Sequence, residues 1–269
     1  MHKPSSGLYL LFPRGQRPED NALRDFVAEQ RTVSITHDPG GQGPHDGEGS
    51  DEAGAEPLAM RTRATADRHR IIELLREGLT FDLAGLAPGE AGDFPDVRHR
   101  FDLDELPGPE RFEPMFIAPG QHLVGGERSI PVVKGLIGLA RDFVHHFDML
   151  SAVVWPHSAS AIGRRYFESI STAWLDGGAF PALGLTAFRE MSDGALQSEG
   201  LAFWIDQELR IEPPVSHDKV AATRLGVRLI NQLILVGGVD QGERIVAPDG
   251  TQLVMRPSRN GMFVQVWRE

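Results

Sequence analysis

The stretch 142–160, "DFVHHFDMLSAVVWPHSAS", holds three of the ten histidines of the chain, with two aspartates and three serines. These side chains supply metal ligands, general acids and bases, and nucleophiles. Asp142 and His146 are four residues apart and would share a helix face, and His157 would be the third ligand of a metal clip. On a helical wheel, however, His145 and His146 diverge and lie off the apolar stripe. We therefore favour a solvated helix face, and we expect no metal and no cofactor.

The segment "WPHSAS" follows an apolar strand-like run and precedes a helical pattern. Ligands and nucleophiles often lie at the point where a strand is followed by a helix. The nucleophile motif G-x-S-x-G is absent. Two interpretations remain open: either Ser158 or Ser160 caps the helix, or the helix N-terminus binds an anion beside Arg164 and Arg165. The candidate ligand-binding residues of this junction are Trp155, His157, Ser158 and Arg164.

The segment 201–212, "LAFWIDQELRIE", alternates between apolar and polar residues and predicts a half-buried strand. Its polar face would carry Trp204, Asp206 and Glu208. Two carboxylates on one strand face suit an acid–base pair, but they equally suit a solvent-facing surface. Trp204 would either anchor a partner on that face or lie beneath a helix.

Composition excludes several classes of site. The chain has no cysteine, so disulfides, thiol nucleophiles and cysteine-bound metal centres are excluded. The formal net charge of −11 makes nucleic acid and anionic membranes poor partners, and it favours a basic protein partner or a small ligand. Of the 27 basic residues only Lys3, Lys134 and Lys219 are lysines, which is typical of a GC-rich bacterial genome. No segment is apolar enough for a signal peptide or a membrane span, so we expect a cytoplasmic protein.

Two regions are predicted, residues 1–113 and 114–269. In the first, residues 7–12, 32–36 and 57–64 predict strands, and residues 18–30 and 67–79 predict helices. Residues 38–56 hold six acidic residues, six glycines and no basic residue, which is typical of a flexible surface loop. Residues 81–113, rich in proline, glycine and acidic residues, predict a linker.

The second region is better organised. Strands are expected at 114–118, 150–155 and 200–212, and helices at 129–147, 160–175 and 218–236. A closing β-meander at 243–267 has turns marked by Pro248-Asp249-Gly250 and Asn260-Gly261. Helices mixed with strands and closing hairpins predict an α+β fold with mixed sheets.

Three motifs of the C-terminal half resemble a known family. They are Val154-Trp155 before a helix, Phe203-Trp204-Ile205-Asp206, and Gly242-Glu243-Arg244-Ile245 before a hairpin. In this order they resemble bacterial domain-of-unknown-function family 4261, over roughly 148–269. The resemblance implies a bacterial cytoplasmic protein, and it implies no catalytic residue.

Two functions from different classes follow. The first is a non-enzymatic protein-binding factor, such as an immunity or accessory protein, indicated by the acidic charge, the acidic loop and Trp204. The alternative is a small-ligand-binding protein or a hydrolase-like enzyme with its site around His157. Convergence of His157, Ser158, Arg164 and a carboxylate in a pocket would favour the alternative.

Overall fold

The computed structural model describes residues 6–40, 70–247 and 249–269. Within them the chain divides into two compact units. Unit 1 comprises Pro95–Pro107 and Ala152–Glu269, and unit 2 comprises the described part of 5–94 together with Gly108–Ser151. This division differs from the expected boundary after residue 113, because residues 114–151 belong with the N-terminal region. The chain passes from unit 2 into unit 1 at Pro95, returns to unit 2 at Gly108, and passes into unit 1 again at Ala152.

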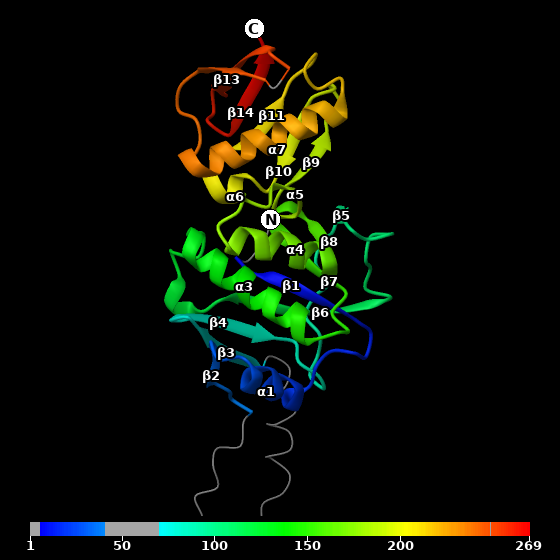
Figure 1. Ribbon diagram of the computed structural model, residues 1–269. Coiled ribbons are helices and arrows are strands. Elements are labelled where there is room, and N and C mark those ends of the chain that lie inside the picture. Colours follow the sequence, from blue (N-terminus) through cyan, green and yellow to red (C-terminus); the bar gives the residue numbers. More distant parts are fainter. Residues whose placement is uncertain (1–5, 41–69, 248) are drawn as a thin grey trace, which may run out of the picture. The chain divides into compact units, whose positions relative to one another are not determined.

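The sheet strands of unit 2 lie in the order β2-β3-β4-β6-β1 (Figure 1). Their bounds are β1 Leu8–Pro13, β2 Val33–His37, β3 Ile71–Arg76, β4 Leu79–Ala84 and β6 Phe112–Pro119. Each neighbouring pair in this order is antiparallel. The strands predicted at 7–12, 32–36 and 114–118 are confirmed. The strand predicted at 57–64, and residues 41–56 of the acidic segment, lie outside the described residues.

Two predicted helices of unit 2 are confirmed as α1, Asp20–Glu29, and α3, Ile130–His146. They pack against one another through Phe26 and Phe143, whose ring centroids are 4.5 Å apart. The helical pattern of 129–147 predicts one apolar stripe, which is half-buried at its last residue, Phe147, and buried at the others, namely Val133, Leu136, Ile137, Ala140, Phe143 and Val144. The stripe places α3 against β4 and β6 of the sheet (Figure 1). A short 3-10 turn, η2 (Gln121–Leu123), joins β6 to this helix region.

The helix predicted over 67–79 is wrong, because the described part of this segment is a hairpin. Arg76 pairs with Leu79, so Glu77 and Gly78 form a two-residue turn, with φ of 52° and 84°. Positive φ at both positions is what a type I′ hairpin turn requires. The apolar pairs of "IIELLR" fit both helical and alternating patterns. The structure uses the alternation, with Ile72, Leu74 and Arg76 buried.

Unit 1 contains a first group of strands in the order β7-β8-β5 (Figure 1). Their bounds are β5 His99–Phe101, β7 Ala152–Trp155 and β8 Ser160–Gly163. Helices α4, Arg164–Leu175, and α5, Ala182–Leu185, follow β8 in the chain. β5 lies within the predicted linker, so the prediction of residues 81–113 as a connecting segment is wrong there. Its three residues are too few to give a periodic signal.

The second sheet of unit 1 has the order β12-β13-β14-β11-β10-β9. The strand bounds are β9 Ala187–Glu190, β10 Leu196–Glu199, β11 Glu208–Ile211, β12 Glu243–Val246, β13 Gln252–Pro257 and β14 Phe263–Arg268. The predicted closing meander is confirmed as the antiparallel run β12-β13-β14. β11 pairs parallel with β14, which makes this sheet mixed.

Helix α7, Lys219–Val236, lies across β10 and β11 (Figure 1). Asp218 caps its N-terminus, accepting hydrogen bonds from the backbone N–H groups of Val220 and Ala221 at 3.0 Å each. Gly237 ends it with φ of 84°, in the left-handed region that favours glycine. The helix predicted at 218–236 is confirmed.

Two predictions in unit 1 need correction. Residues 160–163 are β8, and the helix begins only at Arg164. The strand predicted over 200–212 is present only as β11, because Ala202–Ile205 form the short helix α6 and Asp206 has a positive φ of 61°. A single turn of helix between two strands preserves an apparent alternation, so the pattern cannot reveal it.

Unit 1 and unit 2 together confirm the α+β class and the mixed sheets. Within the described residues, no helix has the length and apolar character needed to cross a membrane.

Candidate functional site

The predicted junction at "WPHSAS" is a hairpin rather than a strand–helix junction. Ser158 ends the 3-10 turn η3, Pro156–Ser158, and Ser160 begins β8. The Ser158 Oγ lies within hydrogen-bond distance of the Ser160 Oγ, at 2.8 Å, and of the Gly184 carbonyl oxygen, at 3.0 Å, and both serines are fully buried. The prediction that either serine caps the helix is wrong, since Gly163 holds that position. These buried hydroxyls bind the hairpin to Gly184, and they are not placed to attack a substrate.

The N-terminus of α4 was the second candidate at this junction. Arg164 begins the helix, while Arg165 is 89% exposed and lies 3.9 Å from an Asp102 carboxylate oxygen. A Cβ added at Gly163 would lie 2.3 Å from the Asp102 carbonyl oxygen. The backbone and side chain of Asp102 therefore lie where an anion would approach the helix end.

Trp155 and His157 belong to an aromatic cluster in unit 1. Its members are Trp155, His157, Trp174, Phe180, Phe203 and Trp204. The His157 ring stacks on Phe203 with centroids 3.9 Å apart, and Trp155 lies 6.0 Å from Trp204. Because Trp204 is half-buried among these rings on α6, it does not project from the polar face of a strand.

Two indole N–H groups of the cluster, those of Trp155 and Trp204, are buried and have no acceptor among the described residues. A buried donor left unsatisfied typically costs about 1–3 kcal/mol. Ring packing therefore holds these two indoles in place.

Glu208 is a structural carboxylate. It accepts hydrogen bonds from the Ser198 hydroxyl and from the backbone N–H groups of Gly200 at 2.9 Å, Leu201 at 3.2 Å and Ala202 at 3.1 Å. Burial raises the pKa of Glu208, and the four donors lower it by a smaller amount, so the pKa lies above its ordinary value. The Glu208 carboxylate thus fixes the start of α6.

Asp206 and Glu208 do not share one strand face, because Asp206 precedes β11. Asp206 is exposed in a left-handed conformation at the end of α6. The predicted acid–base pair is not formed by these two residues.

The residues of the possible metal site, Asp142, His146 and His157, each contact other side chains instead. Asp142 forms a buried ion pair with Arg76 at 3.1 Å in unit 2. His146 lies 3.0 Å from a carboxylate oxygen of Glu29. Across the described residues, no group of three or more histidine, aspartate or glutamate side chains is placed to hold a metal ion.

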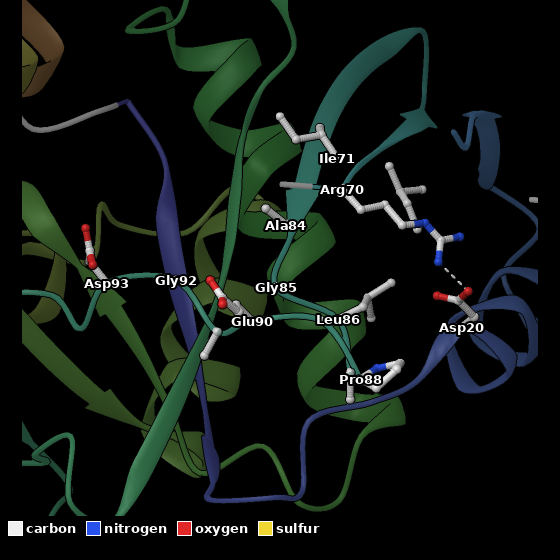
Figure 2. Close-up of a pocket in the computed structure, with 14 residues that line it drawn as sticks. Asp20, Arg70, Ile71, Ala84, Gly85, Leu86, Pro88, Glu90, Gly92 and Asp93 are labelled. Atoms are coloured by element: carbon white, nitrogen blue, oxygen red, sulfur yellow. Dashed lines mark hydrogen bonds and ion pairs between the residues drawn. The ribbon is translucent and has the colours of Figure 1, made fainter. Parts of the chain in front are cut away.

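Unit 2 has a pocket of about 410 Å³ between Asp20, Arg70 and the loop after β4. In Figure 2 the Arg70 guanidinium is directed toward Asp20. Arg70 also bonds Asp38, with its Nε 3.1 Å from the carboxylate. Burial acts to raise the pKa of Asp38. The hydrogen bond from Arg70 is the largest of several opposing effects, and together they hold the pKa of Asp38 below its ordinary value. The arginine of this pocket, which we call the unit-2 pocket, is therefore fully engaged by carboxylates.

Arg17 holds the loop after β4 that lines the unit-2 pocket. Its guanidinium donates to the carbonyl oxygens of Gly85 and Gly89, at 2.5 and 2.9 Å, and to Glu113 at 3.0 Å. The hydrogen bond from Arg17 to Glu113 is the main reason that the pKa of Glu113 lies below its ordinary value. Both arginines beside the unit-2 pocket therefore serve the fold.

Unit 1 has a pocket of about 600 Å³ that includes three arginines, and we call it the arginine pocket. Arg224 and Arg228 reach it from α7, and Arg268 reaches it from the end of β14. Its other lining residues are Pro214, Val215, His217, Asp218, Ala221, Ala222, Leu225, Ala247, Asp249, Thr251 and Leu253. This volume lies within the range of small-ligand pockets, about 300–1,000 Å³.

The charges of the arginine pocket are not balanced within it. Arg224 and Arg228 are exposed and form no ion pair with any other described residue. The carboxylate of Asp218 is occupied by the two N–H groups of the α7 cap. Asp249 accepts from the Thr251 backbone N–H at 3.0 Å, the main reason that its pKa lies below the ordinary value. Both carboxylates serve turns, and the two guanidinium groups on α7 remain unpaired.

Sequence reasoning found α7 and the turn at Asp249-Gly250 but missed this pocket. A signal was present in the pattern of α7. Arg224 and Arg228 are four residues apart, so they are neighbours on one helix face, and like charges at this spacing destabilise a helix. The positions three and four residues from either arginine hold no acidic residue, in a chain with 38 acidic and 27 basic residues. Arg268 could not have been added, because its proximity depends on the fold.

Comparison with known proteins finds no match, either among protein-family models, among curated proteins or among solved structures. The resemblance to family 4261 stays a prediction.

Proposed function

We propose that this chain is a non-catalytic binding protein that receives an anionic group of its ligand in the arginine pocket. The observation that carries the proposal is the pair Arg224 and Arg228, which line the pocket and form no ion pair with any other described residue. Guanidinium groups bind carboxylates and phosphates through paired, charge-assisted hydrogen bonds. An anion between the two would remove the repulsion that their spacing creates.

The non-catalytic part of the proposal follows from the chemistry of the lining. The arginine pocket has one imidazole, that of His217, and both of its carboxylates accept turn hydrogen bonds. At the other candidate, Ser158 is buried and bonded to backbone, and His157 is stacked on a ring. Neither place offers a nucleophile beside a base. The bacterial, cytoplasmic setting and the basic protein partner stay predictions.

The test measures thermal unfolding and calorimetric binding of the full chain with sodium sulfate and with citrate, against sodium chloride at equal ionic strength. Specific binding to the folded state raises the unfolding temperature with ligand concentration. We expect Arg228→Ala to weaken citrate binding about tenfold, the loss of one charge-assisted hydrogen bond. Arg224→Ala should have a similar effect.

Arg259→Ala is the matched control, because it removes the same charge from an exposed turn outside the pocket. It should leave binding unchanged. If citrate and sulfate stabilise the chain no more than chloride does, or if Arg228→Ala and Arg259→Ala behave alike, the proposal is wrong.

A further inference from the structure

Two exposed apolar side chains follow the arginines of the pocket along α7. Leu235 and Val236, at the C-terminal end of this helix, are 87% and 64% exposed. We call these two residues the apolar extension. Single exposed apolar side chains are ordinary, but these two follow unpaired cationic groups on the same helix.

Helix geometry aligns the pocket with the apolar extension. Leu235 lies seven residues after Arg228, which is two turns, about 10 Å along α7 on nearly the same face. Ala221 lies seven residues before Arg228 and lines the pocket as well. The opposite face of α7 is committed to the core through Gly226, Ile230 and Leu233. The exposed stripe of α7 therefore changes from cationic to apolar along its length.

We infer that this stripe binds an acidic amphipathic segment of a protein partner, with carboxylates on Arg224 and Arg228 and an aliphatic side chain on Leu235. The inference rests on the proposed function and names its ligand class. Charge complementarity selects an acidic segment over a basic one. An inorganic anion alone would fill the cationic part and leave the apolar extension bare.

The lining favours a peptide over a nucleotide. Among the described residues no phenylalanine, tyrosine or tryptophan lines the arginine pocket, and its one ring is the imidazole of His217, whereas bases are held in protein sites largely by stacking on rings. Short aliphatic side chains form its wall instead, chiefly Val215, Leu225 and Leu253. These suit leucine, isoleucine or valine side chains of a peptide, bound as helix-in-groove interfaces bind theirs.

The experiment selects from a library of random displayed peptides on the immobilised full chain and sequences the enriched peptides. We expect peptides with two carboxylates and an aliphatic residue about two helical turns away. The best synthetic peptide should bind about tenfold more weakly to Arg228→Ala and about tenfold more weakly to Leu235→Ser, since each removes one of the two contacts.

Val124→Ser is the matched control, because Val124 is 79% exposed and belongs to unit 2. Leu235 makes so little contact that its replacement leaves the fold intact, which unfolding curves verify. If no acidic aliphatic peptides are enriched, or if their binding ignores Leu235→Ser, the inference is wrong. Citrate binding that still depends on Arg228 would then leave the proposed function standing, and its absence would overturn both.

Discussion

Arg70 in unit 2 and Arg228 in unit 1 each line a pocket, but their electrostatic surroundings are opposite. Arg70 is held by two carboxylates, those of Asp20 and Asp38, and its pKa is raised although burial acts to lower it. Arg228 has no carboxylate partner among the described residues, and its neighbour on the helix is another arginine. The volumes of the two pockets alone would not distinguish Arg70 from Arg228. Their ion pairing does, since an arginine whose donors already bind carboxylates of the fold has few donors left for a ligand.

The same contrast holds more widely in unit 2. Arg17 is tied to Glu113 and two carbonyl oxygens, and Arg76 is tied to Asp142. Such arginines stabilise a fold when every donor is satisfied, and they become costly when a partner is removed. Stability therefore depends on the paired arginines, and binding should depend on the unpaired ones. Four predictions test this division.

The largest effect is expected for the buried pair of unit 2. Asp142→Ala leaves the Arg76 guanidinium, whose side chain is 8% exposed, without its main partner. Removal of one member of a buried pair costs about 3–5 kcal/mol of unfolding free energy. Urea unfolding monitored by circular dichroism measures it, with the exposed Asp25→Ala of α1 as the control. A loss below about 1 kcal/mol, the range of surface pairs, would show that the paired arginines are not structural.

A smaller and more direct contrast compares the two pockets. Arg70→Ala removes both carboxylate contacts and should lower the unfolding free energy by about 1 kcal/mol, since the site is only partly buried. Arg228→Ala should change it by less than about 0.5 kcal/mol, and relief of like-charge repulsion on α7 favours a slight gain. Chemical unfolding of the two variants in parallel decides the matter. Equal losses would mean that Arg228 has a structural role and that the comparison fails.

Much of this division between paired and unpaired arginines could not be predicted from the sequence. The i,i+4 spacing of Arg224 and Arg228 is predictable, because it depends only on helix geometry. The ion pair between Arg76 and Asp142 is not predictable, because 66 residues separate the two in the chain, and the sequence pattern offers Asp142 as a metal ligand instead. Long helices and the closing meander were predicted well, since their periodicity extends over many residues.

The short secondary-structure elements could not be predicted from the sequence pattern. The four residues of α6 and the four of β8 lie within longer segments whose patterns predicted another structure. This error placed Trp204 on a strand face and Ser158 at a helix cap. Tertiary contacts decide both, through the Glu208 carboxylate for α6 and the Gly184 carbonyl for the serine hairpin.

The smallest effect concerns acidification. Because the hydrogen bond from Arg17 lowers the pKa of Glu113, ionised Glu113 stabilises unit 2 at pH values above its ordinary pKa of 4.5. This contribution is lost as the pH falls through the lowered pKa, where Glu113 takes up a proton. Glu113→Gln should therefore be less stable than the wild type near neutrality, and the difference should shrink on acidification below pH 4.5. Urea unfolding of both proteins across this range measures the difference.

Sulfate binding to unit 1 should not follow this loss over the same pH range. Arginine side chains remain charged at every pH of the experiment, and sulfate remains an anion. Three arginines line the pocket, namely Arg224, Arg228 and Arg268. Calorimetric titration should show sulfate affinity that is maintained on acidification while the contribution of Glu113 declines. Sulfate affinity that falls together with the stability of unit 2 would show that anion binding depends on the acid-sensitive ion pairs and not on the unpaired arginines of α7.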